Sequence, residues 1–262
     1  MSGQGPGQGR GQGPGQEATW AGFDWTRERY EDMIARVVPD YHEQAVLIAE
    51  TVCAAARNSG PGQIRVLELG AGTGGLAGLL LETIPRAQVT AVDVSLVMLS
   101  ACREVLAPYG NRAQVVEADF ATAELGSGYQ AVVSRLALHH LEDEAKEALV
   151  RRVFEALAPG GVFVNSDMIA GACDEETAAM MAEWRRYMTS RGDDPDEWVQ
   201  WLVGDDDFPA TEQQQLGWLR DAGFAAVQVM WKRAGFATFR AERSRRESAP
   251  DGDVPPRGRR RG

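Results

Sequence analysis

Four glycines stand close together in the stretch VLELGAGTGG at 66–75: Gly70, Gly72, Gly74 and Gly75. They follow the short, apolar segment QIRVLEL, which is typical of a buried strand. Because glycine lacks a Cβ atom, the backbone can turn sharply there and approach a ligand closely. Such a turn at a strand end suits an adenosine-containing cofactor, although the same pattern also occurs in dinucleotide sites and in plain turns.

Acidic and aromatic side chains follow the next two predicted strands. Asp93 ends QVTAVD, where a carboxylate can accept hydrogen bonds from both hydroxyls of a ribose. Asp119 and Phe120 follow AQVVEA and suit the amino group and the ring face of an adenine. Taken singly, Asp93 fits a capping or surface acid equally well, and Phe120 fits a core position. The three strand ends together predict an adenosine site more specifically than the glycines do.

His139 and His140 follow the fourth predicted strand, in a loop at 135–141. Imidazole titrates near neutrality, so either histidine could serve as a general base. Adjacent residues point apart, so we expect at most one of them to face an acceptor; a buried histidine bonded to backbone is the competing interpretation. A metal site would need Glu142 beside them, and the one further histidine is His42, so we predict no metal.

Alternating strands and helices must position these residues. The hydrophobic pattern predicts an α/β domain whose mainly parallel sheet is covered on both faces. Strands are expected at 63–69, 88–93, 113–117, 129–134 and 162–167, the last after a turn at 159–161, and helices at 24–37, 41–57, 74–84, 95–107 (capped by Ser95), 142–157 and 211–222. The final strands, 225–233 and 235–241, are too close in sequence for a crossover, so they predict an antiparallel hairpin.

Residues 174–208 interrupt the alternation, and we expect a helical insertion there that covers the acceptor. The insertion has seven acids between Asp193 and Asp207 and five aromatic residues, Trp184, Tyr187, Trp198, Trp201 and Phe208. Aromatic faces and carboxylates suit a flat or cationic small molecule. Ordinary packing and solvation of helix faces explain the same composition, so the acceptor is not identified.

Three motifs resemble those of the class I methyltransferases that use S-adenosylmethionine (SAM): ExGxGxG at 68–74, AVDVS at 91–95 and EADF at 117–120. The resemblance implies a Rossmann-like class I methyltransferase fold with a seven-stranded, mostly parallel sheet, a C-terminal antiparallel hairpin and an N-terminal helical cap. It also implies SAM as the cofactor, with Glu68 near the methionine amine. A dinucleotide domain would more often read GxGxxG.

A narrower resemblance, to the branch that includes carboxy-SAM synthase, rests on FDWTRERYEDMIARVVPDY at 23–41, VVSRLALHHLED at 132–143 and TEQQQLGWLRDAGF at 211–224. In that branch the N-terminal helices fold over the cofactor, which makes Tyr30, Arg36 and Tyr41 candidate contacts, beside plain packing and surface roles. The loop after the fourth strand adds Arg135 and Leu136. The predicted cofactor-binding residues are therefore Glu68, Gly70, Ala71, Gly72, Gly74, Asp93, Val94, Asp119, Phe120, Arg135, Leu136, Tyr30 and Arg36, and the predicted catalytic residues are His139 and His140.

One departure from that branch concerns the extra carboxylate of carboxy-SAM. The synthase holds this carboxylate with a basic residue of the late insertion. Here no residue between Arg191 and Arg220 is basic, and Gln200 falls near the equivalent place. Because a buried, unpaired carboxylate costs several kcal/mol, we predict ordinary SAM as the cofactor.

The chain is acidic, with a net charge of −11, although 241–262 has seven arginines and four acids. This balance disfavours nucleic acid as a partner; salt-sensitive RNA binding that is lost on removal of 241–262 would revive it. We expect disordered tails at 1–22 and 243–262 around one domain at 23–242. The absence of a long apolar run and of a secretory signal predicts a cytoplasmic protein that does not contact membranes. The resemblance to the branch that includes carboxy-SAM synthase also implies a homodimer.

The predicted function is SAM-dependent methylation of a small molecule at an oxygen, nitrogen or carbon atom. A carboxy-SAM synthase-like or tRNA-modification-related enzyme is one alternative. An NAD-dependent oxidoreductase on the same sheet is another, although the glycine spacing and the terminal hairpin count against it. A non-catalytic SAM-binding or RNA-associated protein is the third.

Overall fold

The computed structural model describes residues 27–202, 204 and 207–245. The predicted N-terminal tail at 1–22 and residues 246–262 of the predicted C-terminal tail lie outside them. Arg243, at the predicted start of that C-terminal tail, still contacts the domain, because its guanidinium donates hydrogen bonds to the carbonyls of Phe154 and Leu157. No helix within the described part is both long and apolar enough to cross a membrane.

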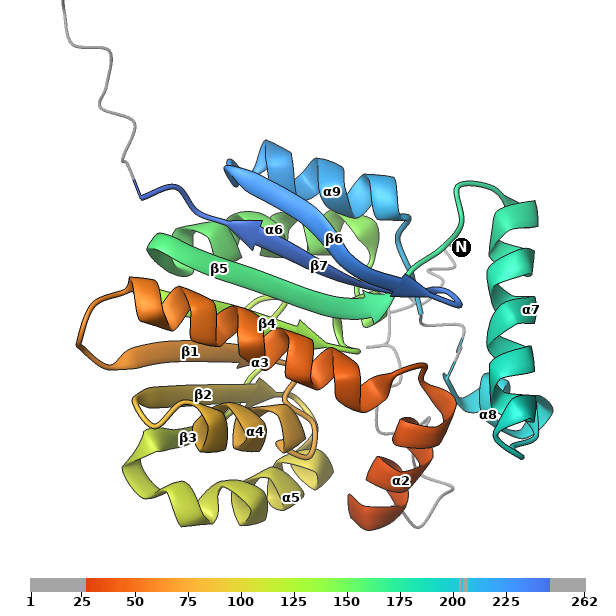
Figure 1. The fold of residues 1–262 in the computed structure, drawn as a ribbon, viewed down its shortest axis with the longest axis horizontal. Helices are drawn as coiled ribbons and strands as arrows, with labels where there is room; N and C mark the ends of the chain where they lie inside the picture. The colour runs from red at the N-terminus through yellow and green to blue at the C-terminus, as the bar shows by residue number, and fades with distance from the viewer. Residues whose placement is uncertain (1–26, 203, 205–206, 246–262) are drawn as a thin grey trace, which may run out of the picture.

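The strands of the described chain form one seven-stranded sheet in the order β3-β2-β1-β4-β5-β7-β6 (Figure 1). Their bounds are β1 (Ile64–Leu69), β2 (Ala87–Asp93), β3 (Ala113–Glu117), β4 (Tyr129–Arg135), β5 (Leu157–Met168), β6 (Ala226–Arg233) and β7 (Phe236–Glu242). Strands β1 to β5 pair in parallel, and β7 runs antiparallel to both β5 and β6. The predicted mostly parallel sheet with a terminal hairpin is confirmed.

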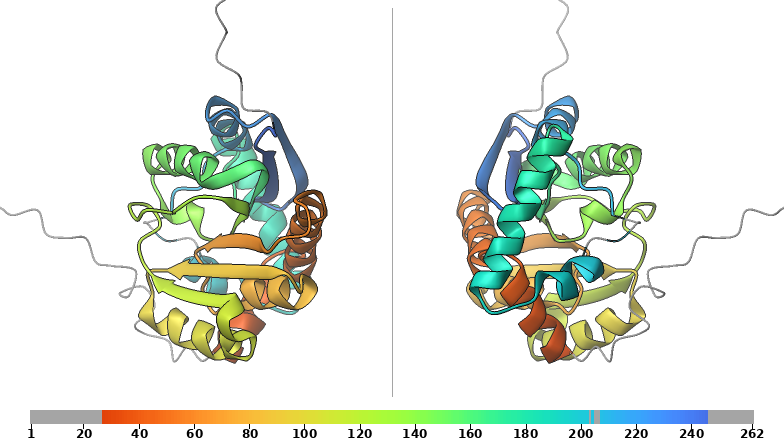
Figure 2. Two further views of the ribbon diagram at one scale, coloured as in Figure 1. Left: turned by 90° about the vertical axis from the view of Figure 1, so that its left-hand side faces the viewer. Right: turned by 90° about the vertical axis from the view of Figure 1, so that its right-hand side faces the viewer.

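Helices cover both faces of this sheet (Figures 1 and 2). Helices α3 (Tyr41–Asn58), α4 (Gly75–Thr83) and α5 (Leu96–Leu106) bury one apolar cluster, and α6 (Asp143–Ala156) and α9 (Glu212–Asp221) bury the other. Strand β1 serves both clusters, since side chains alternate along a strand: Val66 packs with the first cluster and Leu67 with the second. Doubly covered strands explain why the central segments read as continuous apolar runs.

Several local predictions can be compared with the structure directly. Ser95 caps α5 as expected, because its hydroxyl accepts a hydrogen bond from the Met98 amide at 3.4 Å. The predicted turn at 159–161 is wrong: these residues lie inside β5, where the pairing register with β4 shifts. A register shift absorbs the extra residues without ending the strand, and Gly160 (φ +79°) allows the backbone to do so.

A third apolar cluster lies beyond the carboxyl ends of β4 and β5. It joins α2 (Arg27–Val37) to the insertion helices α7 (Asp174–Ser190) and α8 (Pro195–Leu202) (Figures 1 and 2). The indole N–H of Trp184 donates to the Val37 carbonyl at 2.7 Å, and Arg36 pairs with Asp193 at 3.0 Å. The N-terminal cap and the insertion therefore form one cover over the end of the sheet where ligands of such folds bind.

Candidate active site

The glycine turn between β1 and α4 is shaped by three residues with positive φ. Gly70, Gly72 and Gly74 have φ of +71°, +52° and +83°. A Cβ atom on Gly70 would lie 2.2 Å from Cβ of Ala137, and one on Gly74 would lie 2.9 Å from Sγ of Cys102. At Gly72 no described atom lies within 4 Å of that position. Packing therefore demands the outer two glycines, while the middle one faces open space.

Asp93, at the end of β2, lies directly against this turn. One carboxylate oxygen accepts the Gly72 amide at 2.8 Å, and the other accepts the Ser95 amide at 2.9 Å. The amides of Gly70 and the buried Ala71 both donate to the Val92 carbonyl at 2.9 Å. Each oxygen of Asp93 keeps a further lone pair, so the carboxylate can still accept hydrogen bonds from a ligand. The structure thus brings Asp93 to the turn, as the sequence predicted.

Glu68 is buried under the same turn, with 2% of its surface exposed. Its Oε2 atom has no hydrogen-bond partner among the described residues. Burial raises the pKa of Glu68 to about 8; the Arg135 guanidinium opposes this rise and the Asp93 carboxylate adds to it. A buried carboxyl group with an unsatisfied oxygen is destabilising unless a ligand supplies a donor.

Aromatic residues of the N-terminal cap surround these acids. Arg135 donates a hydrogen bond of 2.7 Å to the Tyr41 hydroxyl, and its guanidinium carbon lies 4.0 Å from the centre of the Tyr41 ring. Burial raises the pKa of Tyr30, and the nearby Tyr41 and Asp93 contribute to the rise. Tyr30, Tyr41 and Arg135 therefore gather around the turn. Arg36 does not, since its ion pair with Asp193 directs it to the insertion.

The remaining predicted cofactor residues flank the turn. Phe120 is half-buried, and its ring lies 3.7 Å from where a Cβ atom of Gly70 would stand. Asp119 is exposed and accepts the Ala121 amide at 2.8 Å, which stabilises the local turn. Val94 is 45% exposed. Leu136 follows Arg135 with φ of +53°, a conformation that non-glycine residues rarely adopt and that occurs preferentially at functional sites.

His139 and His140 lie on the short helix η2 (Leu138–His140). Nδ1 of the buried His139 is 2.5 Å from Oδ1 of Asp167, and the other Asp167 oxygen accepts the amides of Leu138 and His139 at 2.9 and 3.1 Å. Burial lowers the pKa of His139, but the Asp167 charge and hydrogen bond outweigh it, so the pKa is raised. A carboxylate bonded to Nδ1 keeps the proton there in the neutral ring and leaves the Nε2 lone pair available.

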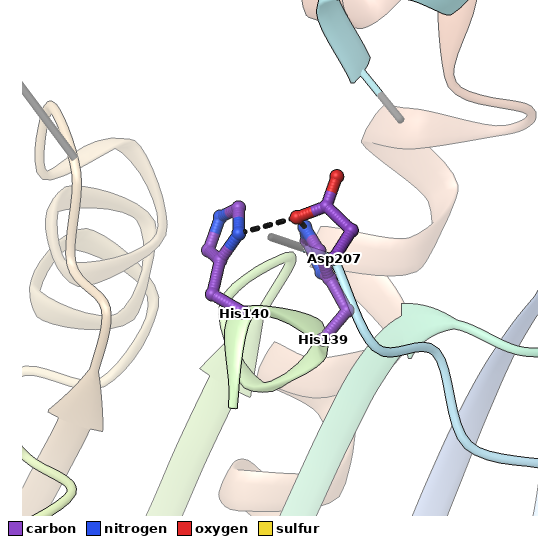
Figure 3. A group of neighbouring side chains, drawn as sticks. All are labelled: His139, His140 and Asp207. Carbon is purple, nitrogen blue, oxygen red and sulfur yellow. Dashed lines mark hydrogen bonds and ion pairs between the residues drawn. The ribbon is translucent and has the colours of Figure 1, made fainter. Parts of the chain in front are cut away.

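Asp207 completes this group (Figure 3). Its Oδ1 is 2.7 Å from Nδ1 of His140 and 3.9 Å from Nε2 of His139. The Phe208 amide donates to the His139 carbonyl at 2.7 Å and so anchors the loop. Burial raises the pKa of Asp207, but the hydrogen bonds from His140 and Gly204 outweigh it, so the pKa is lowered and the group is a carboxylate at neutral pH.

The sequence did not single out Asp167 or Asp207. Asp167 lies near the carboxyl end of β5, next to β4, which the histidines follow. Its position in VNSDM, near the end of a predicted strand, could have indicated that it lies close to them. Asp207 belongs to the acidic run of the insertion, where nothing in the sequence separates it from its neighbours. Donor atoms of His139, His140 and Asp207 lie within 4.8 Å of one another, so they could hold a metal ion; Glu142, the third ligand considered from sequence, is not in this group.

A pocket separates the histidines from the cover formed by α2 and the insertion. Its walls are mainly apolar and include Ile34, Leu136, Met168, Trp184 and Phe236. His139, His140 and Asp207 line it together, and Tyr30, whose hydroxyl is near Asp93, lines it as well. The geometry combines a turn suited to a nucleoside with a neighbouring apolar pocket that ends in an acid–base group.

Comparison with known proteins identifies the segment that contains this turn. Residues 66–161 match the model of a family described as a methyltransferase domain. This segment of the chain is a methyltransferase domain. The matched segment begins in β1 and ends in β5, so it contains the glycine turn, Asp93 and both histidines. The predictions of the family, the fold and the cofactor are confirmed.

Relatives with similar sequences agree with the narrower resemblance. The methyltransferase domain and its flanks are 23% identical to the carboxy-S-adenosyl-L-methionine synthase of Nautilia profundicola over 212 residues, which are 80% of this chain and 88% of that protein. The synthase of Aeromonas hydrophila is 27% identical over 231 residues, covering 84% and 89%. The alignments extend well beyond the matched domain.

Solved structures share the fold. An O-methyltransferase family protein from Burkholderia thailandensis superposes with a TM-score of 0.66 at 19% identity and covers 88% of this chain. Magnesium protoporphyrin IX methyltransferase from Synechocystis, solved with bound S-adenosylhomocysteine (SAH), has a TM-score of 0.57 at 19% identity and covers 83% of this chain and 94% of its own. Other matches are longer proteins: the chain spans 64% of the Burkholderia protein and 51% of the methyltransferase SibL.

The residues of the methyltransferase site fit SAM. The unsatisfied Glu68 oxygen can accept a hydrogen bond from the methionine ammonium, whose charge would favour the ionised carboxylate. The open side of Gly72 lets the backbone approach a ligand, and Asp93 stands beside it with free lone pairs. The individual contacts of the predicted residues with SAM stay predictions.

Proposed function

We propose that this enzyme transfers the methyl group of SAM to a small molecule that binds in the pocket under α2 and the insertion. The proposal rests on the His139–Asp167 pair: His139 lines that pocket, and Asp167 bonds to its Nδ1, which leaves Nε2 for the acceptor. Of the two predicted histidines, we assign the general base to His139. His140, which bonds to Asp207 through Nδ1, positions that carboxylate.

Methyl transfer mainly requires the protein to position the acceptor and to remove its proton. When bound, SAM supplies a methyl carbon on a positively charged sulfur, and the acceptor atom bonds to this carbon while the carbon–sulfur bond breaks and leaves its electron pair on sulfur. His139 Nε2 accepts the proton of the acceptor, and Asp167 stabilises the imidazolium that results. Tyr30, Leu136 and the apolar walls exclude water and hold the acceptor in line.

Carboxy-SAM synthesis is the second candidate, because the relatives quoted above bear that name. The extra carboxylate would need a cationic partner, and none of the described residues that line the pocket is Lys or Arg. This supports ordinary SAM as the cofactor. Mass spectrometry of the purified protein under native conditions discriminates the two: a bound cofactor heavier than SAM by the mass of CO₂ would favour the second candidate.

The cofactor is tested by binding and the base by turnover. We expect SAM and SAH to raise the melting temperature while NAD does not; a shift with NAD alone would overturn the proposal in favour of an oxidoreductase. With acceptors found by screening metabolites for SAH formation, His139→Gln should lower turnover by about 10²–10⁴-fold. The exposed His42 provides the control, since His42→Gln should leave turnover unchanged.

The cytoplasmic location, the small-molecule acceptor and the homodimer belong to the same proposal. Cys53, Cys102 and Cys173 are free thiols, which supports a reducing compartment.

RNA association is tested by truncating the chain after residue 245, so that β7 is left intact. Removal of all of 241–262 would cut into β7 and would remove Arg243, which bonds to the end of α6. Unchanged RNA affinity after that truncation would remove the tail as an RNA-binding element.

A further inference from the structure

The acceptor pocket has an uneven distribution of charge. Asp207 lines its polar end beside His139, and Asp167, with 1% of its surface exposed, bonds to Nδ1 of His139 without lining the pocket. Lys146, whose charge acts on His139, does not line this pocket, since its ammonium donates hydrogen bonds to Asp143 and to the Phe208 carbonyl. None of the described lining residues is Lys or Arg. An anionic group on the acceptor would therefore meet carboxylates without a compensating cation, which is costly in a buried site.

Outside that end, Tyr30 contributes a hydroxyl and the other described lining residues are apolar or already bonded. The Trp184 indole N–H is already bonded to the Val37 carbonyl, so the ring presents only its apolar surface. Phe236 and Met168, which are 1% and 9% exposed, continue this wall across β7 and β5. A ligand body bound here gains stability by burying apolar area and by contact with aromatic faces. Charged or heavily hydroxylated bodies would lose their hydration without replacement.

We infer that the acceptor is a neutral, largely apolar compound with one hydroxyl group that lies against His139, with an alkylphenol as the simplest representative. The inference rests on the proposed function and names its substrate class. A hydroxyl can donate its hydrogen to Nε2 of His139 and still keep oxygen lone pairs for attack on the methyl carbon. An ammonium lacks such a lone pair, and the carboxylates Asp167 and Asp207 stabilise that unreactive form.

The test compares three ligands of matched size on the enzyme saturated with SAH: 4-propylphenol, 4-propylbenzoate and 4-propylbenzylamine. Calorimetry measures binding without turnover, so the result does not depend on reactivity. We expect the phenol to bind about tenfold or more tightly than the benzoate, since one uncompensated charge is worth at least that factor. Asp207→Asn should strengthen benzoate binding and so reduce the difference in affinity between the phenol and the benzoate. Asp174 is an exposed acid at the start of α7, and Asp174→Asn should leave this difference unchanged.

The outcomes separate the inference from the proposed function. Equal or tighter binding of the benzoate, or a benzoate affinity that Asp207→Asn leaves unchanged, would each overturn the inference. Methyl transfer from SAM to the benzylamine and not to the phenol would also overturn it. If SAH binds and none of the three ligands does, the substrate class is wrong while the methyltransferase assignment stands. If SAH itself fails to bind, the proposed function fails.

Discussion

At the scale of single residues, the site contains two buried acids, of which the fold alone satisfies one. Glu68 keeps one carboxyl oxygen without a partner among the described residues, and its pKa is raised to about 8. Asp167 by contrast is fully engaged, with His139 on one oxygen and two amides on the other. Glu68 thus needs a cationic partner from a ligand, whereas Asp167 orients the His139 imidazole.

Glu68→Gln should make the unliganded enzyme more stable and lower its affinity for SAM. The folded-state pKa of Glu68 lies above the ordinary 4.5, so the wild type loses stability as pH rises from about 4.5 to about 8, and glutamine does not. We expect a stability gain that grows over this range to the order of a few kcal/mol, measured by urea unfolding at several pH values. SAM affinity should fall by about tenfold or more. Tighter SAM binding would contradict the predicted pairing with the methionine ammonium.

Asp167→Asn should change the pH profile of turnover as well as its height. The base must be neutral, so the rate rises with pH through the pKa of His139, which Asp167 holds above its ordinary value. Without that carboxylate the pKa falls, so the rise should move to lower pH while the plateau drops by about 10²-fold or more. A lower plateau with an unmoved midpoint would mean that Asp167 acts by packing only.

At the scale of elements, the site depends on the contact between two loops. The turn after β1 and the loop after β4 meet where Gly70 faces Ala137; the first contains the glycines predicted to contact the cofactor, and the second contains the histidines. Strand pairing fixes their approach, because β1 and β4 are parallel neighbours whose carboxyl ends coincide.

Gly70→Ala and Gly72→Ala form a matched pair that tests this contact. Both positions have positive φ, so both variants carry strain of about 1 kcal/mol. Only at Gly70 does the added methyl group collide, with Cβ of Ala137 at 2.2 Å. We expect Gly70→Ala to lower the melting temperature more than Gly72→Ala, and the double variant with Ala137→Gly to recover the difference. Equal losses in the two single variants would rule out the collision.

At the scale of the whole molecule, two segments far apart in the sequence close the pocket. Helix α2 precedes the sheet and α7 follows β5, yet the Trp184–Val37 hydrogen bond and the Arg36–Asp193 ion pair join them. The cover therefore depends on the sheet, which brings both segments to the same end. Arg36, predicted to contact the cofactor, stabilises the cover in this structure.

Trp184→Phe should loosen the cover without affecting the sheet. Losing the indole N–H leaves the Val37 carbonyl unpaired, which costs about 1–3 kcal/mol. We expect the alkylphenol used above to bind several-fold more weakly, about 1 kcal/mol or less on the affinity scale, with SAH affinity nearly unchanged. Trp218→Phe on α9, which lies on the other side of the sheet, serves as the control. An equal loss of phenol affinity in the control would argue against a specific role of the cover.

The sequence by itself determined the α/β order, the terminal hairpin and the residues at the carboxyl ends of β1, β2 and β4. These are local signals: apolar period, glycine punctuation and caps such as Ser95 are readable within a few residues. Even there, the predicted turn at 159–161 is wrong. Glycine and proline indicate an irregular backbone, but they do not indicate whether strand pairing continues beyond it. The parallel order of strands then placed Glu68, Asp93 and His139 at one edge.

Only the tertiary structure decided which acids meet the histidines. Asp167 and Asp207 lie 28 and 68 residues from His139 and are paired with it or with His140 by strand register and by the return of the insertion loop. Side-chain type and spacing carry no information about such contacts, because many acids of the chain could have been solvated instead. The glycine turn could be read from the sequence, whereas the acid–base group facing it needed the fold.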